Sequence, residues 1–169
     1  MENIHDPHNI YACMRTCDAV GVQDLHIVDY RANSFRAGKK SSSSAKRWLS
    51  MHKYDTLSTC FDAVKSSGKK IYTTHLSEDA KSIYEFDFTQ EVAIVFGNEK
   101  DGVSPEAVHL ADGNIVIPQV GMIKSLNISV ALAVTLYEAY RQRKQAGIYK
   151  QPNLSKVDYN NLLQQWSSK

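Results

Sequence analysis

The sequence predicts an α/β protein with a mostly parallel sheet and helices on both of its faces. Two observations lead to this prediction. Segments with the pattern of strands alternate with segments of helical spacing along the whole chain. In addition, residues 92–96 (VAIVF) form a continuous apolar run, as in a strand covered on both faces. Because 169 residues suit one sizeable core, we expect a single domain over 1–169, with a short helical tail over about 150–169.

In the first half of the chain, turn residues separate the predicted elements. The segment HDPHN is turn chemistry, and Asn9 is expected to cap the helix that follows. Gly21 and Gly68 are expected to end the two helices of this half. The predicted elements are a short strand at Glu2–His5, a helix at Asn9–Val20, a strand at Asp24–Tyr30 and a helix at Leu57–Ser67.

The second half continues the alternation. Ser104 and Pro105 open a short helix as its N-cap and first-turn residue. The predicted strands are Lys70–His75, Val92–Phe96 and Asn114–Ile117, and a last small helix is expected over Leu154–Trp166.

The stretch from Ile117 to Gly147 organises the chain. A loop over Gln119–Lys124 leads into a long helix that is apolar on almost every side for two turns, which predicts a buried helix. Ser125 and Asn127 stand where this helix begins, and the backbone N–H groups exposed at such a start suit a polar ligand. Ligands in parallel sheets bind beyond the carboxyl ends of the strands. The loops Thr73–His75, Gly97–Gly102 and Pro118–Ser125 are therefore expected to share one pocket.

The net charge is only +2, but the positive charges are unevenly distributed. No Asp or Glu occurs between Arg31 and Lys53, a segment that also contains a run of serines and Trp48. Such a basic segment is a candidate phosphate-binding surface, and a solvated loop with no partner is the alternative. The candidate RNA-binding residues are Arg36, Lys39, Lys40, Lys46 and Arg47.

Several classes of protein are disfavoured. The sequence contains no dinucleotide fingerprint, no P-loop and no nucleophile elbow. No apolar run has the length of a membrane span, and Met1 leads directly into polar residues, so we expect neither a membrane anchor nor a secretory signal. Three cysteines at irregular positions favour a reducing, cytoplasmic setting. His5, His8, Cys13 and Cys17 match no standard zinc spacing, so no metal is expected.

Three segments carry a resemblance to a known family. HNIYACMRTCDAVGV, FGNEKDGVS and IPQVGMIKSLNISVALAVTLYEAYRQR resemble, in this order and at the right separations, the three motifs of the SpoU branch of the knotted SPOUT methyltransferases. The resemblance covers the chain from about His5 to Tyr149. The details DAVGV, NEKDGVS and YEAYRQR favour the members that modify tRNA over those that modify ribosomal RNA.

The resemblance implies a C-terminal trefoil knot that binds S-adenosylmethionine in a bent form, and a homodimer whose site is shared between chains. Arg15 of one chain would then lie near the cofactor of the other. By motif position, the cofactor-binding residues would be Thr74, Gly97, Ile117, Met122 and Leu126.

The same resemblance assigns the polar residues and the reaction. The implied activity is S-adenosylmethionine-dependent 2′-O-methylation of a ribose in RNA, with the D-loop guanosine of tRNA as the expected target. Ribosomal RNA or another tRNA position is one alternative, and a non-catalytic module that binds RNA or the cofactor is another. The implied catalytic residues are Asn9, Arg15, Glu99, Ser125 and Asn127.

Overall fold

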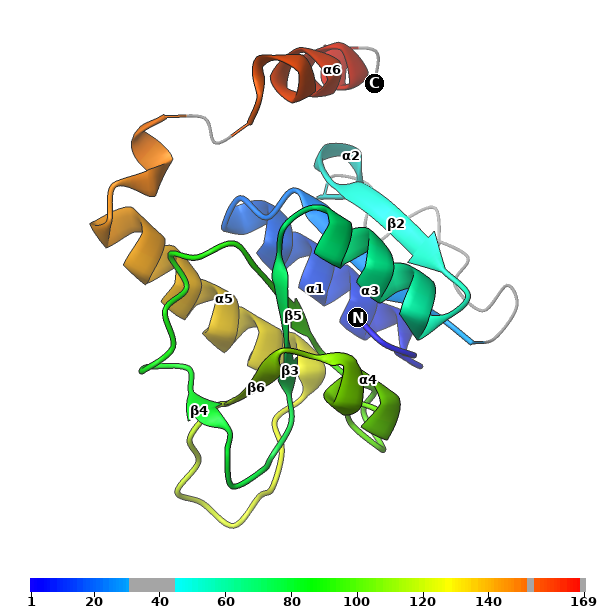
Figure 1. Ribbon diagram of the computed structural model, residues 1–169, viewed down its shortest axis with the longest axis vertical. Helices are drawn as coiled ribbons and strands as arrows, with labels where there is room; N and C mark the ends of the chain where they lie inside the picture. Colours follow the sequence, from blue (N-terminus) through cyan, green and yellow to red (C-terminus); the bar gives the residue numbers. More distant parts are fainter. Residues whose placement is uncertain (31–44, 152–153, 168–169) are drawn as a thin grey trace.

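Parallel strands form the centre of the molecule (Figure 1). The structure, a computed structural model, describes residues 1–30, 45–151 and 154–167. Every strand pair in the described part of the chain is parallel, with strand orders β4-β6-β3-β5 and β1-β2. The strands are β1 (Asp24–Val28), β2 (Ser50–Tyr54), β3 (Lys70–Thr74), β4 (Lys81–Ser82), β5 (Val92–Val95) and β6 (Gly113–Val116).

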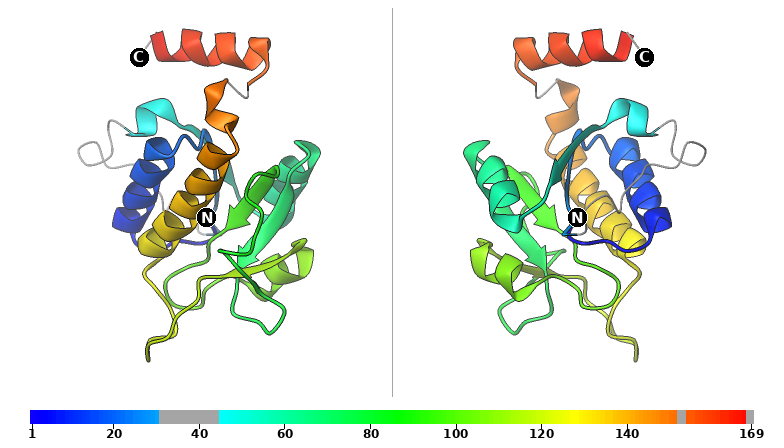
Figure 2. Two further views of the ribbon diagram at one scale, coloured as in Figure 1. Left: turned by 90° about the vertical axis from the view of Figure 1, so that its left-hand side faces the viewer. Right: turned by 90° about the vertical axis from the view of Figure 1, so that its right-hand side faces the viewer.

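Helices cover both faces, as predicted. In Figure 2, α1 and α5 lie on one side of the strands, and α3 and α4 lie on the other. The two cores agree with this arrangement, because Ile94 of β5 packs into the α1–α5 core while its neighbours Ala93 and Val95 pack into the α3–α4 core. The helices are α1 (Pro7–Ala19), α2 (Ala45–Trp48), α3 (Leu57–Ser66), α4 (Pro105–Leu110), α5 (Ile128–Gln145) and α6 (Lys156–Ser167), with a 3₁₀ turn at Ile148–Lys150.

The first residues of the chain join the two groups of strands. The backbone N–H of Glu2 donates to the carbonyl of Phe96, directly after β5, at 2.9 Å, and Glu2 also forms a parallel bridge with Val28 of β1. The predicted strand over Glu2–His5 is therefore reduced to a single bridge. This short pairing nevertheless brings the beginning of the chain next to the end of β5, where the predicted pocket loop starts.

The start of α1 differs from the prediction. Asp6, and not Asn9, is the N-cap, because its side chain accepts a hydrogen bond from the backbone N–H of His8 at 2.8 Å. Pro7 takes the first helical position, where a missing N–H costs nothing. Asn9 lies inside the helix, so its side chain is available for contacts with other segments.

Two strands were missed in the sequence. The basic segment was predicted as a loop up to Lys53, but its last residues belong to α2 and β2. The strand β2 pairs with β1, with Asp24 opposite Ser50 at one end and Val28 opposite Tyr54 at the other. The two-residue strand β4 pairs with β6. Neither segment has a periodic apolar pattern of its own, and both are strands because a neighbouring strand supplies hydrogen bonds.

The prediction that α5 is buried on all sides is wrong for the single chain. Ile128 and Leu132 are buried, but Val130 and Tyr137 are 47% and 54% exposed. The strand β5 is likewise only partly buried along its length. The apolar residues of α5 therefore cover the core on one side and leave an apolar surface on the other. Within the part of the chain that the structure describes, no helix is both long and apolar enough to cross a membrane.

Candidate functional site

The three loops that were predicted to meet do line one pocket. Its volume is about 520 Å³, within the range of sites for small molecules. It lies beyond the carboxyl ends of β3, β5 and β6, at the edge where parallel sheets bind ligands. Four of the five predicted cofactor-binding residues line this pocket: Thr74, Gly97, Ile117 and Leu126.

Met122, the fifth, stands apart from them. It is fully exposed, and it is not among the described residues that line the pocket. Val120 and Ile123 of the same loop are also strongly exposed. The loop between β6 and α5 therefore presents several apolar side chains to the outside of the single chain.

The loop after β5 is a tight hairpin. Asn98 and Gly102 exchange two backbone hydrogen bonds, of 3.0 and 3.1 Å. The side chain of Asn98 also accepts hydrogen bonds from the backbone N–H groups of Lys100 and Asp101, at 2.9 and 2.8 Å. A Cβ atom on Gly97 would lie 2.0 Å from the carbonyl carbon of Gly102, so only glycine fits there. The close approach turns the hairpin back beside the pocket.

A chain of hydrogen bonds connects the three motif segments. Asn9 Nδ2 donates to Glu99 Oε1 at 2.7 Å, and Asn127 Nδ2 donates to Asn9 Oδ1 at 3.1 Å. Asn127 is also the N-cap of α5, because its Oδ1 accepts from the backbone N–H and the hydroxyl of Ser129, at 2.8 and 2.6 Å. Asn9 on α1 thus joins the hairpin after β5 to the first turn of α5.

Glu99 is held by backbone groups as well. Its carboxylate accepts hydrogen bonds from the backbone N–H groups of His5 and Asp6, at 3.2 and 3.3 Å. Partial burial alone would raise the pKa of Glu99, but the hydrogen bonds from Asn9 and the backbone outweigh it, so the pKa is lowered. Glu99 is therefore a carboxylate at neutral pH, suited to orient donors and poorly suited to hold a proton.

The other two predicted catalytic residues differ in position. Ser125 lines the pocket. Arg15 is exposed on α1, and the described lining of the pocket does not include it. In the single chain, Glu99, Ser125 and Asn127 line the pocket, and Asn9 is hydrogen-bonded to Glu99 and Asn127. Arg15 lies outside the pocket.

Sequence reasoning missed some of the pocket's polar residues. Lys100 and Lys124, from two different loops, both line the pocket and are exposed. Gln119 and Asn98 line it too. All four lie within the segments that carry the resemblance, and their position next to the predicted residues was the available signal.

The candidate RNA-binding residues lie elsewhere. Lys46 and Arg47 are exposed on α2, at the end of the molecule opposite to the loop before α5 (Figure 1). The guanidinium of Arg47 lies 6.0 Å from the ring centroid of Trp48, and Trp48 contacts Trp166 of α6 edge to face, with centroids 5.7 Å apart. The remaining candidates, Arg36, Lys39 and Lys40, lie outside the described residues.

The cysteines belong to the core. Cys13 and Cys17 are buried in the α1–α5 core, and burial raises the pKa of Cys13 to about 12 and that of Cys17 to about 11. Both are therefore inert thiols at neutral pH. Across the described residues, no group of three or more His, Cys, Asp or Glu side chains could hold a metal ion.

Comparison with known proteins identifies the family. The tRNA (guanosine(18)-2′-O)-methyltransferase of Thermus thermophilus is 44% identical over 169 residues, which is 100% of this chain and 87% of the relative. The crystal structure of the Aquifex aeolicus TrmH/SpoU tRNA modifying enzyme superposes with a TM-score of 0.90 at 38% identity, covering 99% of this chain and 85% of that one.

A second solved structure bears on the cofactor. The SpoU methyltransferase AviRb from Streptomyces viridochromogenes, in complex with AdoMet, is 28% identical, with a TM-score of 0.76 over 85% of this chain and 59% of that one. The model of the SpoU rRNA Methylase family matches residues 1–137. On this match and on the identities above, the chain belongs to the SpoU methylase family.

Proposed function

We propose that this protein transfers a methyl group from S-adenosylmethionine to the ribose 2′-hydroxyl of the D-loop guanosine of tRNA, in the cytoplasm. The hydrogen-bonded chain Glu99–Asn9–Asn127 at the pocket is the observation on which this rests, because it joins the three motif segments at one place. The relatives at high identity carry the tRNA guanosine-18 activity in their names. Family membership further implies the trefoil knot. The length of the chain suits one methyltransferase domain over 1–169, with the short helical tail over about 150–169.

The pocket suits the proposed cofactor. Its volume of about 520 Å³ accommodates a nucleoside with an amino-acid tail. The absence of a side chain at Gly97 lets the hairpin close tightly against Gly102, and this places the hairpin backbone beside the pocket. Thr74, Gly97, Ile117 and Leu126 would hold the cofactor. When bound, it supplies an activated methyl on a sulfonium centre whose charge disperses during transfer, so no metal ion is needed.

The polar residues would orient the reacting groups. Glu99 holds Asn9, and Asn127 fixes the first turn of α5 beside Ser125. Much of the rate enhancement would then come from aligning the ribose oxygen with the methyl group.

Arg15 is assigned an electrostatic role. A guanidinium stays protonated in proteins and is unsuited to act as a simple base. We therefore propose that Arg15 binds the neighbouring phosphate and stabilises the developing alkoxide. Arg15→Lys should then keep part of the activity, measured as a pH–rate profile. Complete loss would contradict a role of charge alone and would indicate bidentate or base-like use.

A homodimer would bring Arg15 to a pocket. Arg15 lies outside the pocket of its own chain, and both α5 and the loop before it expose apolar side chains, among them Val130 and Tyr137 of α5. A second copy that covers this apolar surface would remove it from water and place Arg15 near the partner's cofactor.

The basic end of the molecule is proposed to bind RNA phosphates. Lys46 and Arg47 lie beside Trp48, and the chain has only two tryptophans, Trp48 and Trp166. Binding of tRNA at α2 should therefore change the intrinsic fluorescence. Reversing the charge of Lys46 and Arg47 together should weaken tRNA binding and reduce its dependence on salt. An unchanged affinity would remove these residues from the RNA surface.

The deciding experiment is transfer of labelled methyl from S-adenosylmethionine to unmodified tRNA transcript, followed by mapping of the modified nucleotide. Label on the D-loop guanosine is the expected result. Cofactor binding without transfer to tRNA would redirect the proposal to ribosomal RNA, which the family description names. Transfer to neither RNA would favour a non-catalytic binding module.

A further inference from the structure

Glu2 is a buried carboxylate outside the predicted set of site residues. Its side chain is 2% exposed. One carboxylate oxygen accepts a hydrogen bond from the hydroxyl of Tyr30 at 2.9 Å, and the other accepts from the backbone N–H of Ser104 at 3.1 Å. A buried charge is costly unless it is hydrogen-bonded, so these partners hold it in one position.

The contact with Ser104 is half of a reciprocal arrangement. Glu2 belongs to the segment 2–9, and its carboxylate accepts an N–H group at the end of the loop 97–104. Glu99 belongs to that loop, and its carboxylate accepts N–H groups from His5, Asp6 and Asn9 of the other segment. Each segment thus supplies one carboxylate that binds the other. We call the four contacts the carboxylate clasp.

The backbone next to Glu2 is held in an uncommon conformation at Asn3. Asn3 has φ 49°, and it is the one residue other than glycine with positive φ in the described ranges. A residue in this region persists only when its surroundings hold it there. Two backbone hydrogen bonds hold Asn3 there. The N–H of Glu2 donates to the carbonyl of Phe96 at 2.9 Å, and the N–H of Asn3 donates to the carbonyl of Val28 at 2.8 Å. The bend fixes where the chain leaves the strands and enters the turn before α1.

We propose that Glu2 is a positioning residue for methyl transfer, which holds the loop 97–104 against the segment 2–9 so that Glu99 stays at the pocket and keeps its hydrogen bond to Asn9. This inference rests on the proposed function for its activity readout. Glu2 is not among the described residues that line the pocket, so it acts through Ser104 and the hairpin. The hydrogen-bond acceptor is the property that matters, because a neutral amide oxygen at this place can still accept the Ser104 N–H, although more weakly than a carboxylate.

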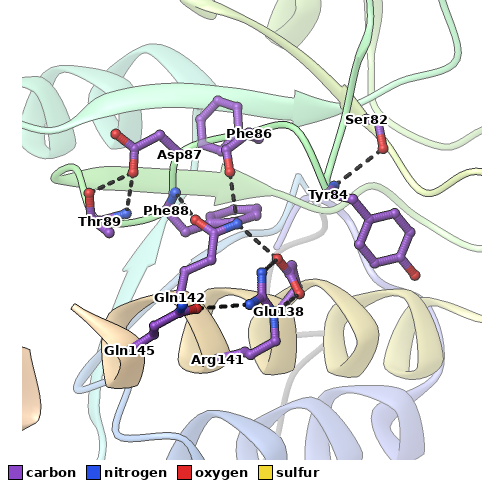
Figure 3. Close-up of polar contacts among 10 residues, drawn as sticks. All are labelled: Ser82, Tyr84, Phe86, Asp87, Phe88, Thr89, Glu138, Arg141, Gln142 and Gln145. Carbon is purple, nitrogen blue, oxygen red and sulfur yellow. Dashed lines mark hydrogen bonds and ion pairs between the residues drawn. The ribbon is translucent and has the colours of Figure 1, made fainter. Parts of the chain in front are cut away.

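The competing explanation is that Glu2 serves stability alone, and the chain offers a matched control. Glu138 is a second buried glutamate, 8% exposed, whose carboxylate accepts hydrogen bonds from Arg141 at 2.8 Å and from Gln142 at 2.9 Å (Figure 3). Glu138 lies ten residues along α5 from Ile128, which is a distance of roughly 15 Å at 1.5 Å per residue. It is not among the described residues that line the pocket. Its loss should destabilise the fold without moving the hairpin.

The experiment compares Glu2→Leu, Glu2→Gln and Glu138→Leu at a temperature where all three are folded. We expect Glu2→Leu to lower kcat at least about ten-fold, because small displacements of positioning groups cost that much. Glu2→Gln, which keeps an acceptor, should stay within about three-fold of wild type, and Glu138→Leu within about two-fold. The proposal would be overturned if kcat fell in proportion to Tm to the same extent in both leucine variants. Full activity of Glu2→Leu would also overturn it.

A second readout does not need activity. Amide hydrogen exchange over residues 97–104 should become faster in Glu2→Leu and stay unchanged in Glu138→Leu. This result stands even if the wild-type protein methylates no tRNA, so failure of the proposed function and failure of the clasp are distinguishable. Unchanged exchange in Glu2→Leu would contradict the clasp.

If Glu2→Leu fails to fold, Ser104 provides another test. Proline can adopt the φ of −65° at Ser104. Because proline has no backbone N–H, Ser104→Pro removes the hydrogen-bond donor to Glu2. Ser104→Ala removes only the capping hydroxyl, which accepts from Ala107 N at 3.1 Å. Lower kcat in the proline variant than in the alanine variant is expected, and equal values would contradict the proposal.

Discussion

At the scale of single residues, Glu99 makes the site sensitive to acid. Its hydrogen bonds lower its pKa in the folded protein below the ordinary value of 4.5. The stability that they contribute is therefore fully present above about pH 4.5 and is lost as the pH falls through the lowered folded pKa.

Thermal unfolding across a pH series checks this. Glu99→Gln should have a lower Tm than wild type near neutral pH, and the difference should shrink as the pH falls below 4.5. The pKa values of Glu138 and Asp87 are lowered too, so the wild-type curve alone cannot isolate Glu99. A constant difference down to pH 3 would mean that the charge of Glu99 contributes nothing.

Many of the residues at the pocket could be predicted from the sequence, but their contacts could not. Motif position identified Asn9, Glu99 and Asn127, whereas the hydrogen bond between Asn9 and Glu99 joins residues 90 positions apart. Glu2 and Ser104 are 102 positions apart. Local spacing contains no information about such pairs, because the sheet order brings them together. Glu2 was therefore read as part of an ordinary strand.

At the scale of elements, the hairpin after β5 depends on Gly97. A Cβ there would lie 2.0 Å from two atoms of Gly102 and 2.1 Å from the backbone nitrogen of Val103. Gly97→Ala must therefore open the hairpin, and we expect at least about a ten-fold loss of S-adenosylmethionine affinity. Isothermal titration measures it, with Gly121→Ala as the control, because a Cβ on Gly121 meets no described atom within 4 Å. Equal affinities would mean that the hairpin backbone does not contact the cofactor.

The C-terminal half of α5 is attached to the segment before β5 through Gln142. Its side-chain amide accepts from the backbone N–H of Phe88 and donates to the carbonyl of Phe86, both at 2.9 Å (Figure 3). Gln142→Leu leaves both backbone groups without this partner, which should lower the free energy of unfolding by about 1–3 kcal/mol. Denaturant unfolding measures it, with the exposed Gln145→Leu as control. Equal small losses in both variants would show that water replaces the amide.

The predicted elements show which local signals suffice. The helices α1, α3 and α5 and the strands β3 and β5 were found because each has its own apolar period or run. The strand β2 has the mixed sequence Ser-Met-His-Lys-Tyr and depends on pairing with β1. The cap of α1 was misplaced because Asp6 and Asn9 are both capping residues by type, and only the position of Pro7 in the first turn decides between them.

At the scale of the whole molecule, α5 was predicted to be buried on every side, but the single chain buries only one. Its uniform apolar character still carries information, because Val130 and Tyr137 remain exposed. In a homodimer the same side chains would be covered. The proposed homodimer thus explains why α5 is apolar on the side that carries Val130 and Tyr137, because that side is exposed in the single chain.

A shared site makes a prediction that a self-contained site does not. Arg15→Ala and Glu99→Ala should each be inactive as homodimers. Co-expression with two different tags gives a heterodimer in which one site carries both substitutions and the other carries neither. Because the two sites of a two-fold dimer are equivalent, this heterodimer should recover about half of the wild-type activity. If Arg15 served its own chain, each site would keep one defect and the heterodimer would be inactive. Methyl transfer by the purified heterodimer, with each tagged homodimer as control, therefore decides whether Arg15 acts across the interface.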